Sequence, residues 1–236
     1  MYNIRFPIVL VDADDTIFDF KKAEYHALKK TLNHFGEDCS DEDVMLYSQI
    51  NLKHWKKLEK GIIEREYLKI HRFEEWFSLM GFNLDAKLFN AMYAPSLGDF
   101  SFLIDGAEKF LKKLSKICDV YIVTNGLTVT QTRRINQSSI KPYIKNIYIS
   151  ETIGYSKPCK EFFDFCINDI GEVDRSKYII LGDSLTSDMQ GGRNADIATC
   201  YFCRDGKISD NELCDYEIIE YNDFFDIINS SENNNF

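Results

Sequence analysis

Apolar residues near the start of the chain run without a break over residues 8–11 and end at a group of carboxylates. A continuous apolar run with β-branched side chains is typical of a parallel strand that is covered on both faces. Similar short runs recur later in the chain, and each of them predicts a further strand. These strands are expected at residues 120–123, 147–149, 178–181, 199–202 and 216–219.

Apolar positions three and four residues apart predict helices over much of the remaining chain. Four successive helices, separated by glycines or a turn, are expected directly after the first strand. They span residues 20–35, Ser40 to Gly61, Tyr67 to Gly81, and Asp85 to Tyr93 with an end before Pro95. Ser40 is the expected N-cap of the second helix, because acidic residues follow it in the first turn. Later helices, at residues 106–117, 128–137, 161–170 and 187–195, alternate with strands.

This alternation predicts an α/β fold with a doubly wound, mainly parallel sheet. A parallel crossover needs only about a dozen residues, so the long helical segment after the first strand must be an inserted unit. We therefore expect a Rossmann-like core domain of residues 1–17 and 97–229 and an all-helical domain of residues 18–96. The polar residues 230–236 are expected to form a flexible tail.

The chain has 236 residues and a net charge of -10, from 28 basic and 38 acidic residues. This charge repels polyanions, so no nucleic acid polymer is expected as a partner. The seven cysteines follow no framework spacing and no apolar stretch suits a signal peptide or membrane span, which predicts a cytoplasmic protein without a membrane partner. Cys200 and Cys203 lie in an apolar run without a second pair, which favours buried thiols over a zinc or redox site.

Polar residues with complementary chemistry follow four of the predicted elements. They are Asp12-Ala13-Asp14-Asp15-Thr16, Thr124-Asn125-Gly126, Lys157-Pro158, and Gly182 to Asp188. Ligands of open α/β sheets bind beyond the carboxyl ends of the strands, so these segments are expected to meet at one edge. Two carboxylates two residues apart allow one to attack and the other to protonate. Lys157 supplies the positive charge that the acids require, and Asp183 adds an oxygen ligand for Mg²⁺ beside Asp12.

With these motifs in this order, the sequence resembles the haloacid dehalogenase superfamily of aspartyl-phosphate phosphohydrolases over nearly its whole length. The resemblance implies that Asp12 is the nucleophile that forms an aspartyl-phosphate. It also implies that Asp14 protonates the leaving oxygen and then activates water. Dehalogenase members lack an acid at this position because a halide needs no proton, so Asp14 favours phosphoryl transfer.

The resemblance also implies which residues bind the phosphate and a Mg²⁺ cofactor. The implied phosphate-binding residues are Thr124, Asn125 and Lys157. The implied metal ligands are Asp12, the backbone carbonyl of Asp14, Asp183 and, as a ligand or a residue behind the ligands, Asp188. Asp188 has the alternative role of capping a helix near Ser187, and Asp15 and Asp19 are expected to be local turn or capping acids.

Within the superfamily, residues 12–20, Arg72-Phe73 and residues 181–188 are similar to the pyrimidine nucleoside 5′-phosphatase (5′-nucleotidase) subgroup. This likeness implies a small phosphorylated metabolite as substrate, a nucleoside monophosphate with a pyrimidine preference, selected by a helical cap. The candidate residues for substrate contact are Asn51, His54, Trp55, Arg72 and Phe73. Aromatic residues at helical spacing usually belong to a core, so Trp55 and Phe73 keep that structural alternative.

Several alternatives stay open at this point. The same scaffold serves a sugar-phosphate or phosphoglycolate phosphatase and a phosphomutase. A phospho-accepting signalling module also places acids, a Thr and a Lys at strand ends, although it needs neither a second acid at Asp14 nor a cap. A binding protein without catalysis is the remaining class, and the sequence is compatible with a monomer or a homodimer.

Overall fold

The computed structural model describes residues 4–204, 206, 208 and 211–229, and the chain divides into two compact units. The first unit comprises Met1–Asp19, Leu103–Gly126 and Ser138–Phe236, and the second comprises Phe20–Phe102 and Leu127–Gln137. The second unit therefore contains the inserted helices and one segment from beyond the second strand. The tail expected at residues 230–236 lies outside the described residues.

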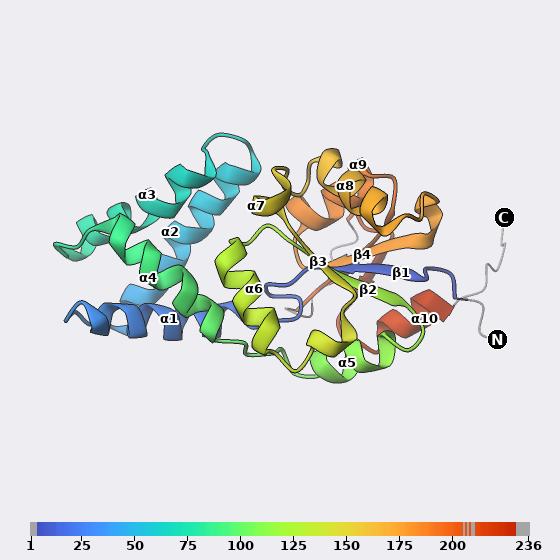
Figure 1. Ribbon diagram of the computed structural model, residues 1–236, viewed down its shortest axis with the longest axis horizontal. Helices are drawn as coiled ribbons and strands as arrows, with labels where there is room; N and C mark the ends of the chain where they lie inside the picture. Colours follow the sequence, from blue (N-terminus) through green and yellow to red (C-terminus); the bar gives the residue numbers. More distant parts are fainter. Residues whose placement is uncertain (1–3, 205, 207, 209–210, 230–236) are drawn as a thin grey trace. The chain divides into compact units, whose positions relative to one another are not determined.

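The first unit is built on a sheet whose described strand pairs are all parallel (Figure 1). The strand order is β3-β2-β1-β4-β5-β6. The strands are β1 (Ile8–Val11), β2 (Asp119–Thr124), β3 (Asn146–Ile149), β4 (Tyr178–Gly182), β5 (Ala198–Phe202) and β6 (Tyr216–Ile218). Because the order runs outward in both directions from β1, the predicted doubly wound parallel sheet is confirmed.

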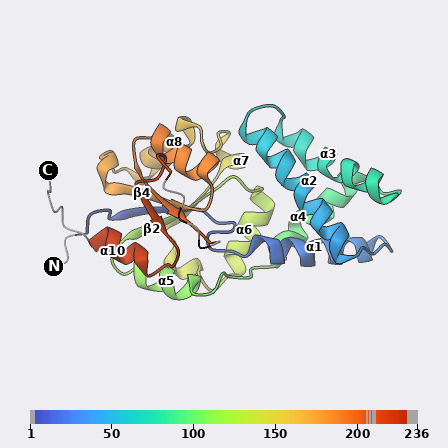
Figure 2. The same ribbon diagram turned by 180° about the vertical axis from the view of Figure 1, so that it is seen from behind.

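Helices cover both faces of this sheet. Helices α5 (Ala107–Leu114) and α10 (Asp223–Asn229) lie on one face, and α8 (Lys160–Ile170) and α9 (Gln190–Asn194) lie on the other, as the view from behind also shows (Figure 2). The shorter helical turns are η1 (Lys141–Tyr143), α7 (Ser150–Ile153), η2 (Arg175–Lys177) and η3 (Leu185–Met189). Helix α10 was not among the predicted helices, because seven residues are too few to show a helical period.

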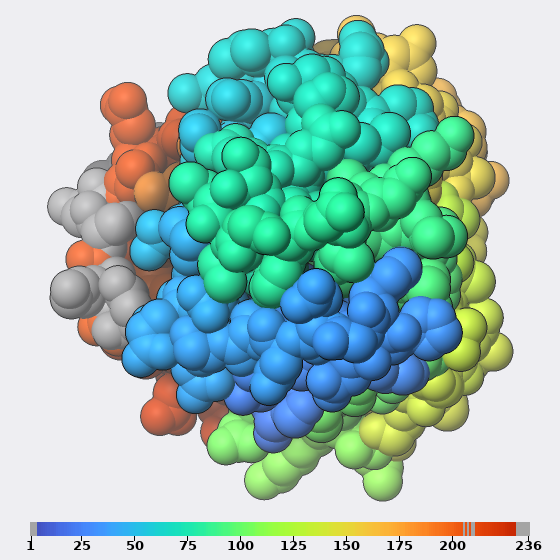
Figure 3. Space-filling model, turned by 90° about the vertical axis from the view of Figure 1, so that its left-hand side faces the viewer, coloured from blue at the N-terminus to red at the C-terminus, as the bar shows by residue number. Residues whose placement is uncertain are grey.

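The second unit contains five helices in the described chain, and Figure 3 views it with α1 in blue and α4 in green. They are α1 (Phe20–His34), α2 (Asp41–Glu59), α3 (Arg65–Met80), α4 (Ala86–Asp99) and α6 (Thr128–Gln137). The core that α1 to α4 share is rich in aromatic rings, which include Tyr47, Phe73, Trp76 and Phe89. Ser40 caps α2 as predicted, since its side chain accepts from the Asp43 amide while the Asp43 carboxylate accepts from the Ser40 amide.

Helix α4 continues through Pro95 to Asp99, so the prediction that it ends before the proline is wrong. A proline inside a helix removes one backbone donor and normally kinks or ends the helix. Here the residues on both sides of it are buried, with Tyr93 and Leu97 packed in the helical core. Packing of the two adjacent turns therefore outweighs the local preference of the proline.

Two further predictions concern membranes and thiols. None of the helices in the described part of the chain is long and apolar enough to cross a bilayer. Cys200 and Cys203 are not joined in a disulfide and both are buried, which confirms the predicted burial of the two thiols.

Candidate active site

The register of the central strands brings the predicted motifs to one edge of the sheet. Val11 of β1 pairs with Ile122 of β2 on one side and with Leu181 of β4 on the other. The amide of Asp12 then donates to the Leu181 carbonyl at 2.9 Å, which extends the pairing by one residue. The residues that follow β1, β2 and β4 consequently emerge side by side, as expected for the carboxyl ends of parallel strands.

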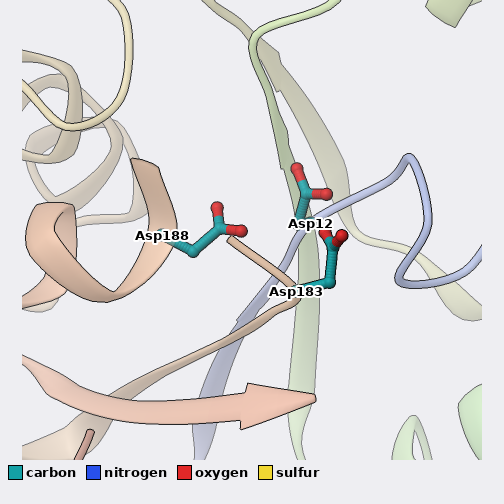
Figure 4. Close-up of side chains that lie close together, drawn as sticks. All are labelled: Asp12, Asp183 and Asp188. Atoms are coloured by element: carbon teal, nitrogen blue, oxygen red, sulfur yellow. The ribbon is translucent and has the colours of Figure 1, made fainter. Parts of the chain in front are cut away.

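Three carboxylates form a cluster at this edge. One oxygen each from Asp12, Asp183 and Asp188 lies within 4.8 Å of the others, and Figure 4 shows the three side chains pointing toward one another. The pKa of Asp183 is raised to about 7, first by burial and then by the neighbouring carboxylates of Asp188 and Asp15. Three hard oxygen donors this close together are a donor set suited to a divalent cation such as Mg²⁺.

Asp188 reaches this cluster because the helix that carries it begins irregularly. Residues Leu185–Met189 form a π-helical turn, η3, that is capped by Ser184, whose hydroxyl accepts from the Ser187 amide at 3.2 Å. The predicted regular helix over residues 187–195 is thus a π-helical turn followed by the short α9. The buried Asp188 side chain accepts a hydrogen bond from the Ser184 amide at 3.1 Å. Because Ser184 is the N-cap and Asp188 lies inside the turn, Asp188 does not have the alternative role of capping the helix.

Lys157 is the counter-charge to the acids. Its Nζ donates to Asp12 Oδ1 at 2.5 Å, to Asp188 Oδ1 at 2.6 Å and to the carbonyl of Val123 at 2.9 Å, and the side chain is 1% exposed. Burial alone would lower the pKa of Lys157, but the two carboxylates raise it above its ordinary value. Conversely, burial raises the pKa of Asp12 and the ammonium offsets part of that rise. Lys157 therefore joins the ends of β1 and β2 to η3.

Thr124 and Asn125 follow β2 at the same edge. The buried Thr124 hydroxyl accepts from the Gly126 amide at 3.1 Å. The Asn125 side chain forms two hydrogen bonds with the backbone of Lys157: Nδ2 donates to its carbonyl at 2.8 Å, and Oδ1 accepts from its amide at 2.9 Å. This pair of bonds fixes the residue that carries the ammonium, a supporting function that the sequence did not indicate for Asn125.

Asp14 is not one of the three clustered carboxylates and belongs to the loop that follows β1. It is partly exposed, whereas Asp12 is buried, and it forms a bridge with Phe18 where the loop turns back. The two acids of the first motif therefore occupy different environments. Such a difference is what separate roles as nucleophile and proton donor require.

The predicted substrate-contact residues lie in the helical unit, and most of them are buried there. Asn51 accepts from Arg72 Nη1 at 2.9 Å and donates to Glu24 at 2.9 Å. Phe73 is fully buried and stacks on Tyr47 with ring centroids 5.2 Å apart. His54 is also buried, and its Nε2 lies 3.0 Å from a carboxylate oxygen of Glu75. Trp55 differs from the other four candidates because it is only half-buried.

Gly182, the first residue of the motif that ends at Asp188, has a steric role that the sequence does not indicate. A Cβ atom at this position would lie 2.3 Å from Asp188 Oδ2 and 2.7 Å from Asp188 Cβ, so only glycine lets Asp188 reach the cluster. The available signal was a glycine between an apolar strand and an aspartate, a place where close approach of another chain segment is common.

Replacing Gly182 with alanine should lower the free energy of unfolding by about 1–3 kcal/mol, the usual cost of forcing an extra carbon into a packed site. Urea unfolding of Gly182→Ala measures this loss. The matched comparison is the same change in an Asp188→Gly background, where the clashing atoms are absent and the cost should shrink. An equal cost in both backgrounds would contradict the steric explanation.

Comparison with known proteins identifies the family of the chain. Residues 9–202 match the haloacid dehalogenase-like hydrolases, and the chain belongs to this family. Among its relatives, YfnB of Bacillus subtilis (strain 168) is 34% identical over 226 residues, which cover 95% of this chain and 96% of YfnB. The crystal structure of YfnB bound to magnesium has a TM-score of 0.89 at 33% identity and covers 96% of this chain and 100% of that one.

Two further relatives bear the name pyrimidine 5′-nucleotidase. PynA of Streptococcus pneumoniae (strain ATCC BAA-255 / R6) is 31% identical over 228 residues, 96% of each chain. YjjG of Escherichia coli (strain K12) is 28% identical over 193 residues, 82% of this chain and 84% of YjjG. The superfamily and subgroup resemblance is confirmed, and the predicted enzyme class, a phosphoric monoester hydrolase, agrees with the family and with these relatives.

Proposed function

We propose that this protein is a Mg²⁺-dependent phosphatase that hydrolyses nucleoside 5′-monophosphates, with a preference for pyrimidines, through an aspartyl-phosphate. The observation that carries the proposal is the buried Lys157, which bridges Asp12 and Asp188 at the strand edge where Asp183 also lies. The substrate class is supported by PynA and YjjG, whose names specify pyrimidine nucleotides.

Asp12 is suited to act as the nucleophile because Lys157 supplies a counter-charge for its carboxylate. Burial would favour its protonated form, but the ammonium of Lys157 at 2.5 Å stabilises the carboxylate, and only the carboxylate can attack. In the first step an Asp12 oxygen forms a bond to phosphorus while the bond from phosphorus to the ester oxygen breaks. Asp14 donates its proton to that leaving oxygen.

The second step restores the enzyme. Asp14, now deprotonated, accepts a proton from a water molecule whose oxygen attacks the phosphorus of the aspartyl-phosphate. The bond between phosphorus and the Asp12 oxygen breaks, and inorganic phosphate leaves. The partial exposure of Asp14 suits this role, because the residue must reach both the leaving group and water.

Mg²⁺ would be held by Asp12, Asp183 and the backbone carbonyl of Asp14, with Asp188 beside them. When bound, the cation supplies positive charge that stabilises the phosphoryl oxygens. Lys157 contributes positive charge from the protein itself, and Thr124 presents a hydroxyl at the end of the neighbouring strand. Asn125 is proposed to contact the phosphate, and its side chain also fixes the backbone of Lys157.

Substrate selection is assigned to the helical unit. Of the residues predicted to contact the substrate, Trp55 retains accessible surface, whereas Asn51, His54, Arg72 and Phe73 are held inside the unit. We therefore propose Trp55 as the direct contact and the other four as residues that fix the helices around it.

A panel of phosphate esters tests the proposed substrate class. With Mg²⁺, kcat/KM for UMP, dUMP and dTMP should exceed that for phosphoglycolate and sugar phosphates by at least about tenfold, since a built pocket discriminates by this much or more. Chelation of the metal should abolish turnover. Equal or better turnover of sugar phosphates would reject the nucleotide preference, and transfer of the phosphoryl group to a sugar hydroxyl instead of water would indicate a phosphomutase.

A further inference from the structure

The loop that carries Asp14 folds back on itself directly after β1. We call residues 13–18 the acid loop. The Ala13 carbonyl accepts from the amides of Ile17 at 3.0 Å and Phe18 at 2.9 Å, and the Asp15 amide donates to the Phe18 carbonyl at 2.8 Å. Within this turn Asp15 has φ of 56°, a left-handed conformation that residues other than glycine adopt rarely.

Two side chains from the end of the chain hold this loop. Nη1 of Arg204 donates to Asp15 Oδ1 at 2.8 Å. The hydroxyl of Tyr221 donates to the Thr16 carbonyl at 2.6 Å, and this contact is buried. The two residues therefore bind successive positions of the acid loop, immediately after Asp14, from segments that follow β5 and β6.

These contacts restrain the part of the loop whose backbone conformation is least favourable without them. The ion pair with Arg204 holds the side chain of Asp15, the residue with the left-handed backbone. Thr16 is held on two sides, because its hydroxyl also donates to Asp183 Oδ1 at 3.2 Å while its carbonyl accepts from Tyr221. With Asp12 fixed in the sheet and residues 15 and 16 fixed from outside, the backbone of Asp14 has little freedom left.

We infer that Arg204 and Tyr221 are positioning residues that hold the acid loop so that Asp14 can transfer its proton, an inference that rests on the proposed function. Both lie beyond residue 202, where the match to the family ends, and neither belongs to a motif. Catalytic groups must stay within a fraction of an ångström of their productive positions. Greater mobility of this loop therefore lowers the rate of the reaction.

The two contacts differ in what their removal would disturb. Tyr221 is largely buried, with its ring stacked on Phe110 at 4.7 Å, so Tyr221→Phe keeps the packing and removes only the hydroxyl. The Arg204–Asp15 pair is partly exposed, with side chains 35% and 25% accessible, and such pairs contribute little to global stability. Neither variant is therefore expected to unfold the protein.

The experiment compares Tyr221→Phe, Arg204→Ala and Arg204→Lys with two matched controls. Tyr178→Phe removes another buried tyrosine hydroxyl that donates to a carbonyl at 2.6 Å, that of Glu172, at the opposite end of β4. Arg175→Ala removes a similar partly exposed ion pair, with Asp164, at that end. Hydrogen exchange of the Asp15, Ile17 and Phe18 amides and steady-state kinetics with UMP and Mg²⁺ are the two readouts.

In Tyr221→Phe and Arg204→Ala, exchange of these three amides should accelerate about tenfold, and kcat should fall about five- to twentyfold while KM changes less than about twofold. Arg204→Lys should recover part of kcat, and the controls should match the wild type in both readouts. Unchanged exchange and kcat in Tyr221→Phe would overturn the inference for Tyr221. A higher KM at unchanged kcat in Arg204→Ala would overturn it for Arg204, because that result describes a substrate contact.

Hydrogen exchange separates this inference from the proposed function. If the wild type hydrolyses no phosphomonoester, the proposed phosphatase fails, while faster exchange in the two variants would still show that Arg204 and Tyr221 hold the loop. If the wild type is active and exchange does not change, the positioning role alone is rejected.

Discussion

Asp12→Asn should lower kcat for UMP hydrolysis by at least about 10⁴-fold, a loss typical of removing a nucleophile. The amide has nearly the same shape as the carboxylate but cannot form the bond to phosphorus, and it no longer carries the charge that faces Lys157. Release of inorganic phosphate in the presence of Mg²⁺ measures the effect. Retention of the wild-type rate would show that the activity comes from a contaminant and would return the protein to the class of binding proteins.

Two further variants make this result specific. Asp119→Asn changes an exposed aspartate that forms a surface ion pair with Lys145, and it should keep the wild-type rate. Asp14→Asn should also be severely impaired, because the leaving oxygen then lacks its proton donor. Unimpaired phosphate release by Asp14→Asn would remove the acid–base role and favour a phospho-accepting signalling module.

Lys157→Met should lower the free energy of unfolding in metal-free buffer by about 3–5 kcal/mol, the cost of leaving buried charges without their partner. The substitution keeps the length of the side chain but leaves Asp12 and Asp188 facing each other without the ammonium that binds both. Activity should fall at least about 10³-fold, because in the proposed mechanism the same ammonium stabilises the nucleophile and the phosphoryl oxygens. Urea unfolding and phosphate release measure the two effects.

Lys177→Met is the matched control for this prediction. Lys177 pairs with Glu172 at the protein surface, where its side chain is 43% exposed, so its replacement should change stability by less than about 0.5 kcal/mol. If Lys157→Met were as stable as this control, the bridge between the two carboxylates would not be a major contribution to the fold.

The sheet and the polar residues at its carboxyl edge could be predicted because both are encoded by residues close together in the sequence. Each strand is a short apolar run, and the polar residues that end β1, β2 and β4 could be placed together once the sheet was known to be parallel. Contacts between distant segments have no such signal. Arg204 and Tyr221 reach the acid loop across 189 and 205 positions of the chain, and nothing in the residues around them indicates it.

Tertiary packing also overrode local preferences in two places. Pro95 predicted the end of a helix that in fact continues, because buried residues on both sides of it hold the turn together. Asp188 suited an N-cap, but the π-helical turn and the missing side chain at Gly182 bring it into the carboxylate cluster instead. In both cases packing in the folded protein decides the outcome against the usual preference of the residue.

The composition of the helical unit determines which segments must be moved together if the unit is exchanged between related proteins. Helix α6 belongs to this unit although it follows β2, and its Thr130 hydroxyl donates to the Ala94 carbonyl of α4 at 2.8 Å. Gly98 of α4 is also so close to Thr130 that an added Cβ would lie 2.9 Å from its carbonyl oxygen. A chimera that transplants only the first inserted segment would separate two helices that fit each other, so the transferable cassette consists of residues 20–102 together with residues 127–137.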